Sequence, residues 1–237
     1  MKKVLLLILA LSLMAGVATV WATVIGTPHD IGTEPCAMCH TPHSGMGQYP
    51  LWNRSQVGGE VTSYNMYQAS ISYDMIEGAS LTPRSPSSLC LVCHNGIASE
   101  LVNYPGPCSN PDPTYDLQIA GCADLGTDLS NDHPLSFNYD DQLDVDLNGF
   151  TAAVPYNSST RGRYAIQGAI SNTLYPLYGT VNITGGILEN NWFECATCHA
   201  VHDTAIPVYE GKGSTQVYFL RSDNSGSQMC LDCHKNR

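Results

Sequence analysis

The pentapeptide Cys-x-x-Cys-His occurs four times in this chain of 237 residues, and it constrains the fold more than any other feature. In chain order the copies are Cys36-Cys39-His40, Cys90-Cys93-His94, Cys195-Cys198-His199 and Cys230-Cys233-His234. In a c-type haem site the two thiols add to the haem vinyl groups and the adjacent histidine binds the iron. The motifs therefore predict four covalently bound haem c groups, numbered haem 1 to haem 4.

Zinc binding and thiol redox chemistry are the alternatives for paired cysteines. Eight cysteines suffice for two four-cysteine zinc sites, and a bare Cys-x-x-Cys also suits a redox centre. Neither alternative explains a histidine directly after every pair. We therefore interpret all four motifs as haem attachment sites.

Residues 1–22 have the pattern of a secretory signal peptide. Two lysines precede an apolar run over residues 4–20, and Val20-Trp21-Ala22 offers a small-residue cleavage site, so we expect cleavage before Thr23. An uncleaved membrane anchor is the alternative. No other stretch approaches the length of about 18 apolar residues that a membrane span needs, so none is predicted in the mature chain. Export agrees with the motifs, because c-type haem is attached outside the reducing cytosol.

The mature chain is distinctly acidic. Removing residues 1–22 takes away two lysines and no acidic residue, which leaves 21 acidic residues against 8 lysines and arginines. Such a surface disfavours binding to nucleic acid or to anionic membranes, and it favours solubility or basic partners.

Residues 23–237 are predicted to form a single tetrahaem domain with a haem-packed core. The 21 glycines, 14 prolines and scarce periodicity indicate mostly irregular structure, with short α-helices at the motifs and little β-structure. The motifs are separated by 49, 100 and 30 residues. This spacing defines a haem pair over 36–94, an insert over 95–194 and a second haem pair over 195–234.

The two haem pairs resemble one another, which indicates an internal duplication. Each begins with Cys-x-x-Cys-His-x-x-His, at 36–43 and 195–202, and ends with a motif that has leucine after its first cysteine. Trp52-Asn53-Arg54 and Phe219-Leu220-Arg221 fall at similar places between the motifs.

Two features of the insert carry structural predictions. Cys108 and Cys122 are the cysteines outside the motifs, and in an exported protein a disulfide between them is expected, with two free thiols as the alternative. Residues 174–187 alternate apolar and β-prone side chains around glycines, which indicates a small strand pair.

A third feature of the insert resembles the start of a calcium loop. Asp144, Asp146 and Asn148 offer oxygen ligands at alternate positions before a glycine, but the twelfth position, where an EF-hand has glutamate, is Pro155. A full EF-hand is therefore excluded. An irregular Ca²⁺ site and a solvated acidic turn remain as the alternatives.

The histidine count matches the haem count. Of eight histidines, four belong to the motifs and four are spare, namely His29, His43, His133 and His202. If each spare histidine binds an iron, all four haems are bis-histidine and closed to substrate. Met46, Met66 and Met75 are rival ligands, and a surface position is the alternative for any single histidine.

Chain connectivity restricts which haem each spare histidine can reach. His43 lies three residues after His40, which already holds one face of haem 1, so it is expected to serve a different haem. The same reasoning directs His202 away from haem 3. His29 and His133 are separated from the motifs by longer segments, and each can reach a neighbouring haem.

These motifs resemble those of multihaem c-type cytochromes, and the similarity is greatest to the OmcE-like tetrahaem cytochromes of extracellular nanowires. The resemblance rests on the segments 36–43, 132–135 and 230–234. It implies a continuous stack of haems in a head-to-tail homopolymer, in which one haem per subunit takes its histidine from the adjacent subunit. By its place in the first motif, His43 is the residue implied for that role.

The leading hypothesis is electron transfer without catalysis, in an extracellular filament that receives electrons from redox proteins and passes them to external acceptors. A monomeric periplasmic shuttle with the same haem chemistry is the first alternative. The second is a multihaem reductase, which requires at least one iron with an open coordination position.

Overall fold

The computed structural model describes residues 24–30, 35–41, 45, 51–54, 64–67, 86–96, 124–139, 151, 153–156, 164–179, 191–202, 209–210 and 216–234. Helical structure is found at all four motifs. A 3-10 turn, η1 (Pro35–Met38), lies at motif 1, and α3 (Ser87–His94), α4 (Cys195–Cys198) and α5 (Gln228–Cys233) lie at motifs 2, 3 and 4. A second 3-10 turn, η3 (Ser225–Ser227), leads into α5.

Each motif forms about one helical turn, because its five residues span little more than the 3.6 residues of a turn. In motifs 1, 3 and 4 the backbone N–H of the histidine donates to the carbonyl of the first cysteine, at 2.8, 3.0 and 2.8 Å. Residues three and four positions apart lie on the same face of a helix. The turn therefore presents both thiols and the imidazole on one side.

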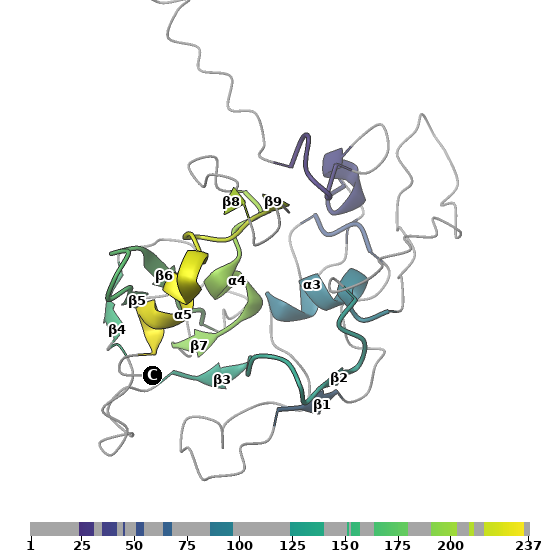
Figure 1. Ribbon diagram of the computed structural model, residues 1–237. Helices are drawn as coiled ribbons and strands as arrows, with labels where there is room; N and C mark the ends of the chain where they lie inside the picture. The colour runs from purple at the N-terminus through teal and green to yellow at the C-terminus, as the bar shows by residue number, and fades with distance from the viewer. Residues whose placement is uncertain are drawn as a thin grey trace, which may run out of the picture.

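The strands in the described part of the chain are short and form four separate small sheets. β1 (Asn65–Met66) pairs in parallel with β2 (Asp128–Leu129), and β3 (Phe137–Asn138) pairs antiparallel with β7 (Trp192–Phe193). β4 (Ala153–Pro155), β5 (Tyr164–Gln167) and β6 (Leu174–Pro176) form an antiparallel meander, and β8 (Tyr209–Glu210) pairs with β9 (Gln216–Val217). In Figure 1, α3 with β1 and β2 lies on one side of the molecule, and α5 with β4–β6 lies on the other.

The strand at the start of the predicted 174–187 pair finds its partner earlier in the chain. β6 pairs with β5, which precedes it, and residues 180–190 lie outside the described residues. The turn between the two strands is closed by a hydrogen bond from Gly168 N–H to the Thr173 carbonyl at 2.8 Å. Asn172 in this turn has φ 59°, a left-handed conformation that asparagine tolerates.

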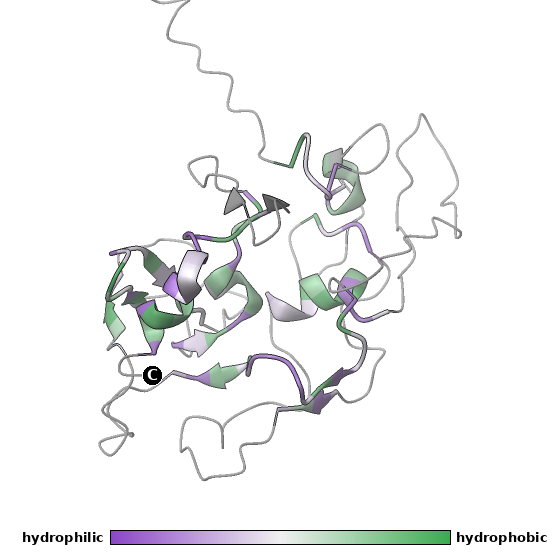
Figure 2. Ribbon diagram, viewed as in Figure 1, coloured by the Kyte–Doolittle hydropathy of each residue, from purple (hydrophilic) through white to green (hydrophobic). Residues whose placement is uncertain are grey.

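Among the described residues, two small apolar clusters pack against cysteines of the motifs. The first contains Phe137, Tyr139, Ile166, Tyr175, Leu177 and Phe193, and Cys198 and Cys233 pack against it. The second contains Tyr64, Met66, Leu91, Leu129 and Leu135, and Cys195 packs against it. Figure 2 shows hydrophobic segments in green at α3 and around β4–β6. Motif 3 thus lies between the two clusters, with one cysteine on each.

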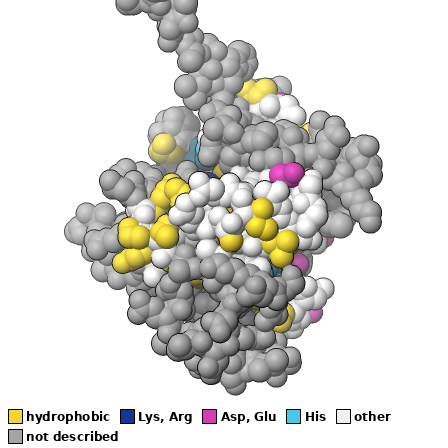
Figure 3. Space-filling model, turned by 60° about the vertical axis from the view of Figure 1, so that its left-hand side comes forward, with side chains coloured by type: hydrophobic (Ala, Val, Ile, Leu, Met, Phe, Trp, Pro, Cys, Tyr) yellow, Lys and Arg dark blue, Asp and Glu magenta, His cyan; other side chains and the backbone are white. Residues whose placement is uncertain are grey.

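The β4–β6 sheet has its buried residues on the first cluster and leaves large apolar side chains outside. Tyr164, Ile170 and Leu174, in β5, the following turn and β6, are all exposed. Figure 3 shows apolar side chains in small groups on this side of the molecule. The three side chains contribute surface rather than core.

Motifs 1 and 3 share a local backbone arrangement, with a register that differs by one residue from the sequence comparison. In these two motifs the residue after the histidine bonds a left-handed residue: Thr41 N–H donates to Leu51 O (2.7 Å) and Ala200 N–H to Phe219 O (2.8 Å). Leu51 has φ 61° and Phe219 has φ 64°. Leu51-Trp52-Asn53 therefore corresponds to Phe219-Leu220-Arg221, because hydrogen bonding, not side-chain type, defines the equivalence.

Candidate haem-binding sites

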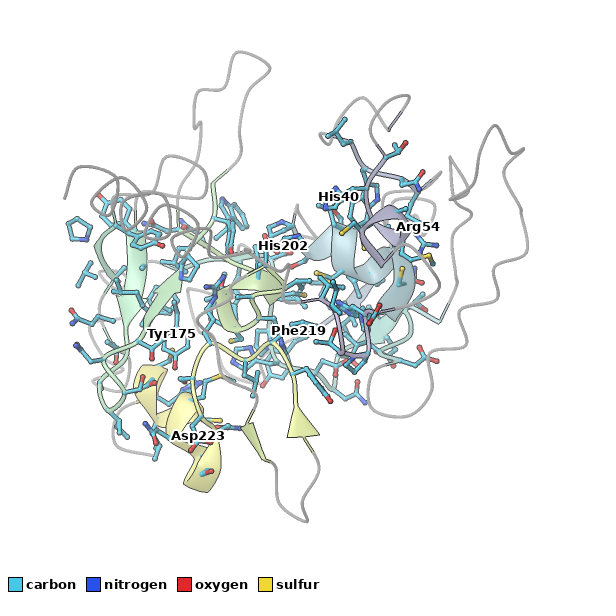
Figure 4. The ribbon with its side chains drawn as sticks, turned by 90° about the horizontal axis from the view of Figure 1, so that it is seen from above. His40, Arg54, Tyr175, His202, Phe219 and Asp223 are labelled. Carbon is cyan, nitrogen blue, oxygen red and sulfur yellow. The ribbon has the colours of Figure 1, made fainter. Side chains whose placement is uncertain are left out.

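Three spare histidines each lie beside a motif histidine. Ring centroids are 5.8 Å apart for His40 and His202, 6.0 Å for His29 and His94, and 6.3 Å for His133 and His234. In each pair the two residues come from parts of the chain far apart in sequence. Figure 4 shows His40 and His202 on separate segments that approach each other.

These separations fit an iron held between two imidazoles. Two metal–nitrogen bonds of about 2 Å, with about 1.1 Å from each nitrogen to its ring centroid, require centroids about 6.2 Å apart. The three observed values differ from this requirement by at most about 0.4 Å. The residues present therefore fit bis-histidine haem at motifs 1, 2 and 4.

His133 is also held in the tautomer that binds a metal. Its Nδ1 lies 2.8 Å from the carbonyl oxygen of Pro134, which can only accept, so Nδ1 carries the proton and Nε2 keeps its lone pair. The ring stacks on Phe193 at 5.1 Å with an interplanar angle of 26°. Both contacts fix the direction in which Nε2 points.

His29 is positioned by Phe219, which lies in the second haem pair. Its ring stacks on Phe219 at 4.7 Å, with an interplanar angle of 27°. Burial, together with the neighbouring His94, His199 and His202, lowers the pKa of His29 to about 4. His29 is therefore neutral near pH 7, and the neutral imidazole is the form that binds iron.

His199 is the motif histidine without a histidine partner in the part of the chain that the structure describes. Burial, followed by the nearby charges of His94 and Arg221, lowers the pKa of His199 as well. His43, the remaining spare histidine, lies outside the described residues.

The four motifs follow one another in space in chain order. Cysteines of consecutive motifs interact electrostatically or by hydrogen bonds, in three places: Cys39 with Cys93, Cys90 with Cys195, and Cys198 with both Cys230 and Cys233. Burial raises the pKa of Cys39 to about 11 and that of Cys198 to about 12, which reflects their apolar surroundings. The attachment points therefore form a continuous row.

A buried carboxylate joins motifs 2 and 3. Glu194 is fully buried directly before Cys195, and its Oε2 accepts hydrogen bonds from the hydroxyls of Ser87 in α3 and of Ser136, the latter at 2.9 Å. The Ser87 hydroxyl in turn accepts the N–H of Cys195 at 2.9 Å. Glu194 also forms a capping box with Thr197, which fixes the start of α4.

A second buried carboxylate lies inside motif 4. Asp232 accepts hydrogen bonds from the N–H groups of Ile170 (2.8 Å) and Ser171 (2.7 Å), from the Ser171 hydroxyl and from the Tyr175 hydroxyl (2.5 Å). Burial acts to raise the pKa of Asp232, but these donors outweigh it and the pKa is lowered. The ionised carboxylate ties α5 to the β5–β6 turn.

Two arginines hydrogen-bond the motif backbones. Arg54 is almost fully buried, and its Nε donates to the carbonyl of Met38 inside motif 1 at 2.9 Å. Arg221 Nε donates in the same way to Ala196 inside motif 3, at 3.1 Å. Sequence reasoning did not select these arginines, Glu194 or Asp232. The available signals were a carboxylate directly before motif 3 and another inside motif 4, and one arginine at a similar place after motifs 1 and 3.

Several predicted sites receive no structural description. His43, the disulfide cysteines Cys108 and Cys122, and the calcium-loop residues Asp144, Asp146 and Asn148 all lie outside the described residues, as do the rival ligands Met46 and Met75. Met66 is described, and it is buried in the second apolar cluster. Among the described side chains, no group of three or more His, Cys, Asp or Glu residues is arranged to hold a bare metal ion.

The described residues include no helix that is both long and apolar enough to cross a membrane. No protein-family model matches the chain, and no curated protein matches its sequence.

Proposed function

We propose that the protein is an exported electron-transfer protein that holds four bis-histidine haem c groups in a row. The observation that supports this most directly is the set of three spare histidines at 5.8–6.3 Å from three motif histidines. When bound, each haem would supply an iron that accepts and releases one electron. The row of cysteines would keep successive haems close together.

The side chains of the protein would bind the haems and exclude substrates from the iron. The motif cysteines anchor each macrocycle, the motif histidine holds one face of the iron, and the distal histidine closes the other. A closed iron has no position for a substrate, so this arrangement favours electron transfer over catalysis. The Pro134 carbonyl and Phe193 orient His133, as an outer shell does for a metal-ligating histidine.

We further propose that the protein polymerises head to tail and that His43 closes haem 3 of the adjacent subunit. The resemblance to nanowire cytochromes suggests this role for His43, and the lack of a described histidine partner for His199 makes haem 3 available. A contact of this kind that does not close on itself generates a filament.

The haem chemistry is tested on the secreted, haem-loaded protein. Mass spectrometry should find four haems per chain, and electron paramagnetic resonance should find only low-spin iron. Carbon monoxide should bind little of the reduced protein, because no iron is open. Binding to a substantial fraction of the haem in the assembled protein would instead favour the reductase alternative.

The filament is tested by electron microscopy of two matched variants. His43→Ala and His133→Ala each remove one distal ligand and should each open one iron in four. Only His43→Ala should also abolish filaments, because only His43 bridges two subunits. Filaments that persist in His43→Ala would refute the bridging role, and dispersed particles of the wild type would favour a monomeric shuttle.

A further inference from the structure

We propose that two buried side chains of opposite charge grade the reduction potentials along the haem row, with Arg54 raising that of haem 1 and Asp232 lowering that of haem 4. Within one subunit, electron transfer from haem 4 towards haem 1 would then be downhill. This inference rests on the proposed electron-transfer function and adds a potential gradient within each subunit.

Arg54 supplies the positive charge at the haem 1 end of the row. Its side chain is 1% exposed, and its Nε–H bond to the Met38 carbonyl, at 2.9 Å, fixes it against motif 1. Its positive charge acts on the thiols of both Cys39 and Cys93, which attach haems 1 and 2. The charge therefore lies at the junction of these two motifs.

Asp232 supplies the negative charge at the haem 4 end of the row. It occupies one of the two variable positions of motif 4 and is 0% exposed. Two backbone N–H groups and two hydroxyls bond its carboxyl group, and it directly precedes Cys233, on whose thiol its charge acts. In Figure 4, Arg54 lies beside His40 on one side of the molecule, and Tyr175, which bonds Asp232, lies on the other.

The sign of each effect follows from electrostatics. A ferric haem carries one more positive charge than a ferrous haem, so a nearby anion favours the ferric form and a nearby cation the ferrous form. The effect is strong only where water does not screen the charge. The buried Glu194 acts on the Cys90 thiol of motif 2 and directly precedes motif 3, so its negative charge partly offsets that of Arg54 at haem 2. At haem 3 it partly offsets Arg221, whose Nε bonds Ala196 inside motif 3.

Spectroelectrochemical titration of the holoprotein tests the inference. Asp232→Asn should raise the low-potential end of the titration curve and leave the high-potential end in place, whereas Arg54→Gln should lower the high-potential end. Each affected haem should change its ferrous-to-ferric ratio roughly tenfold at a fixed potential, which is about 60 mV for one electron. Asp223→Asn is the matched control, because Asp223 precedes α5 but is only partly buried and bonds Ser225 in contact with water, so it should leave the curve unchanged.

A fourth variant separates charge from structure. Tyr175→Phe removes one hydrogen bond to Asp232 but keeps the negative charge, so it should not raise the low-potential end. If Tyr175→Phe shifts the curve as Asp232→Asn does, or if Asp232→Asn acts on the high-potential end, the inference is overturned. Four haems with low-spin spectra in all variants would show that the proposed function still holds in that case.

Discussion

Replacement of Gly168 by alanine is expected to destabilise the protein through motif 4. A Cβ at this position would lie 2.6 Å from Cγ, 2.7 Å from Oδ1 and 2.8 Å from Oδ2 of Asp232. Carbon atoms do not approach so closely, so the carboxylate must move. It cannot move freely, because Ile170, Ser171 and Tyr175 hold it with four hydrogen bonds.

The cost follows from the number of bonds that the carboxylate loses. Loss of two charge-assisted hydrogen bonds at about 1.5 kcal/mol each lowers the free energy of unfolding by about 3 kcal/mol. For a chain of this size, that corresponds to a fall in Tm of about 10 °C. Thermal unfolding of the haem-loaded protein, followed by circular dichroism, measures this change.

Gly126→Ala is the matched control. Gly126 has φ +64° and open space around its Cα, so alanine there meets only the strain of a left-handed backbone, about 1 kcal/mol. Gly168→Ala should therefore lower Tm about three times as much as Gly126→Ala. Equal falls in the two variants, or an unchanged Tm in Gly168→Ala, would refute the close approach of Gly168 to Asp232.

Three further predictions concern hydrogen bonds, ligands and pH. Ser87→Ala should lower the free energy of unfolding by about 2–3 kcal/mol in a denaturant titration, because the buried Glu194 carboxylate and the Cys195 N–H lose their partner. Ser88→Ala is the control and should cost little, because the buried Ser88 hydroxyl has no partner among the described residues. Carbon monoxide should bind about a quarter of the haem in His133→Ala or His202→Ala, and about half in the double variant. If the double variant also bound carbon monoxide at only about a quarter of its haem, the two histidines would share one iron. Burial, followed by the bond to Asp232, raises the pKa of Tyr175, so its contribution to stability is complete below about pH 10 and is lost as pH rises through the folded-state pKa. Tyr175→Phe should accordingly lose less stability than the wild type in alkaline denaturation, and an equal loss would contradict this assignment.

The sequence indicated the positions of the helices but not the sheets around them. A five-residue motif that must place three groups on one face predicts a helical turn, and helical turns are found at Cys36, Cys90, Cys195 and Cys230. The sheets are strands of two to four residues, too short for an alternation pattern to be distinguished in sequence. The predicted pairing of 174–187 missed β5 for this reason. The haem-packed core itself stays a prediction.

The sequence by itself determined the prediction of haem sites, because it contains four Cys-x-x-Cys-His motifs and an equal number of spare histidines. Connectivity alone also directed His202 away from haem 3, and the structure places it beside His40. Which spare histidine meets which motif histidine was decided by the tertiary structure, since the partners are separated by 65 to 162 residues in the chain. The roles of Arg54 and Asp232 also required the structure. The sequence does not show whether a charged residue is exposed or buried. Only burial gives its charge a strong effect on a neighbouring site.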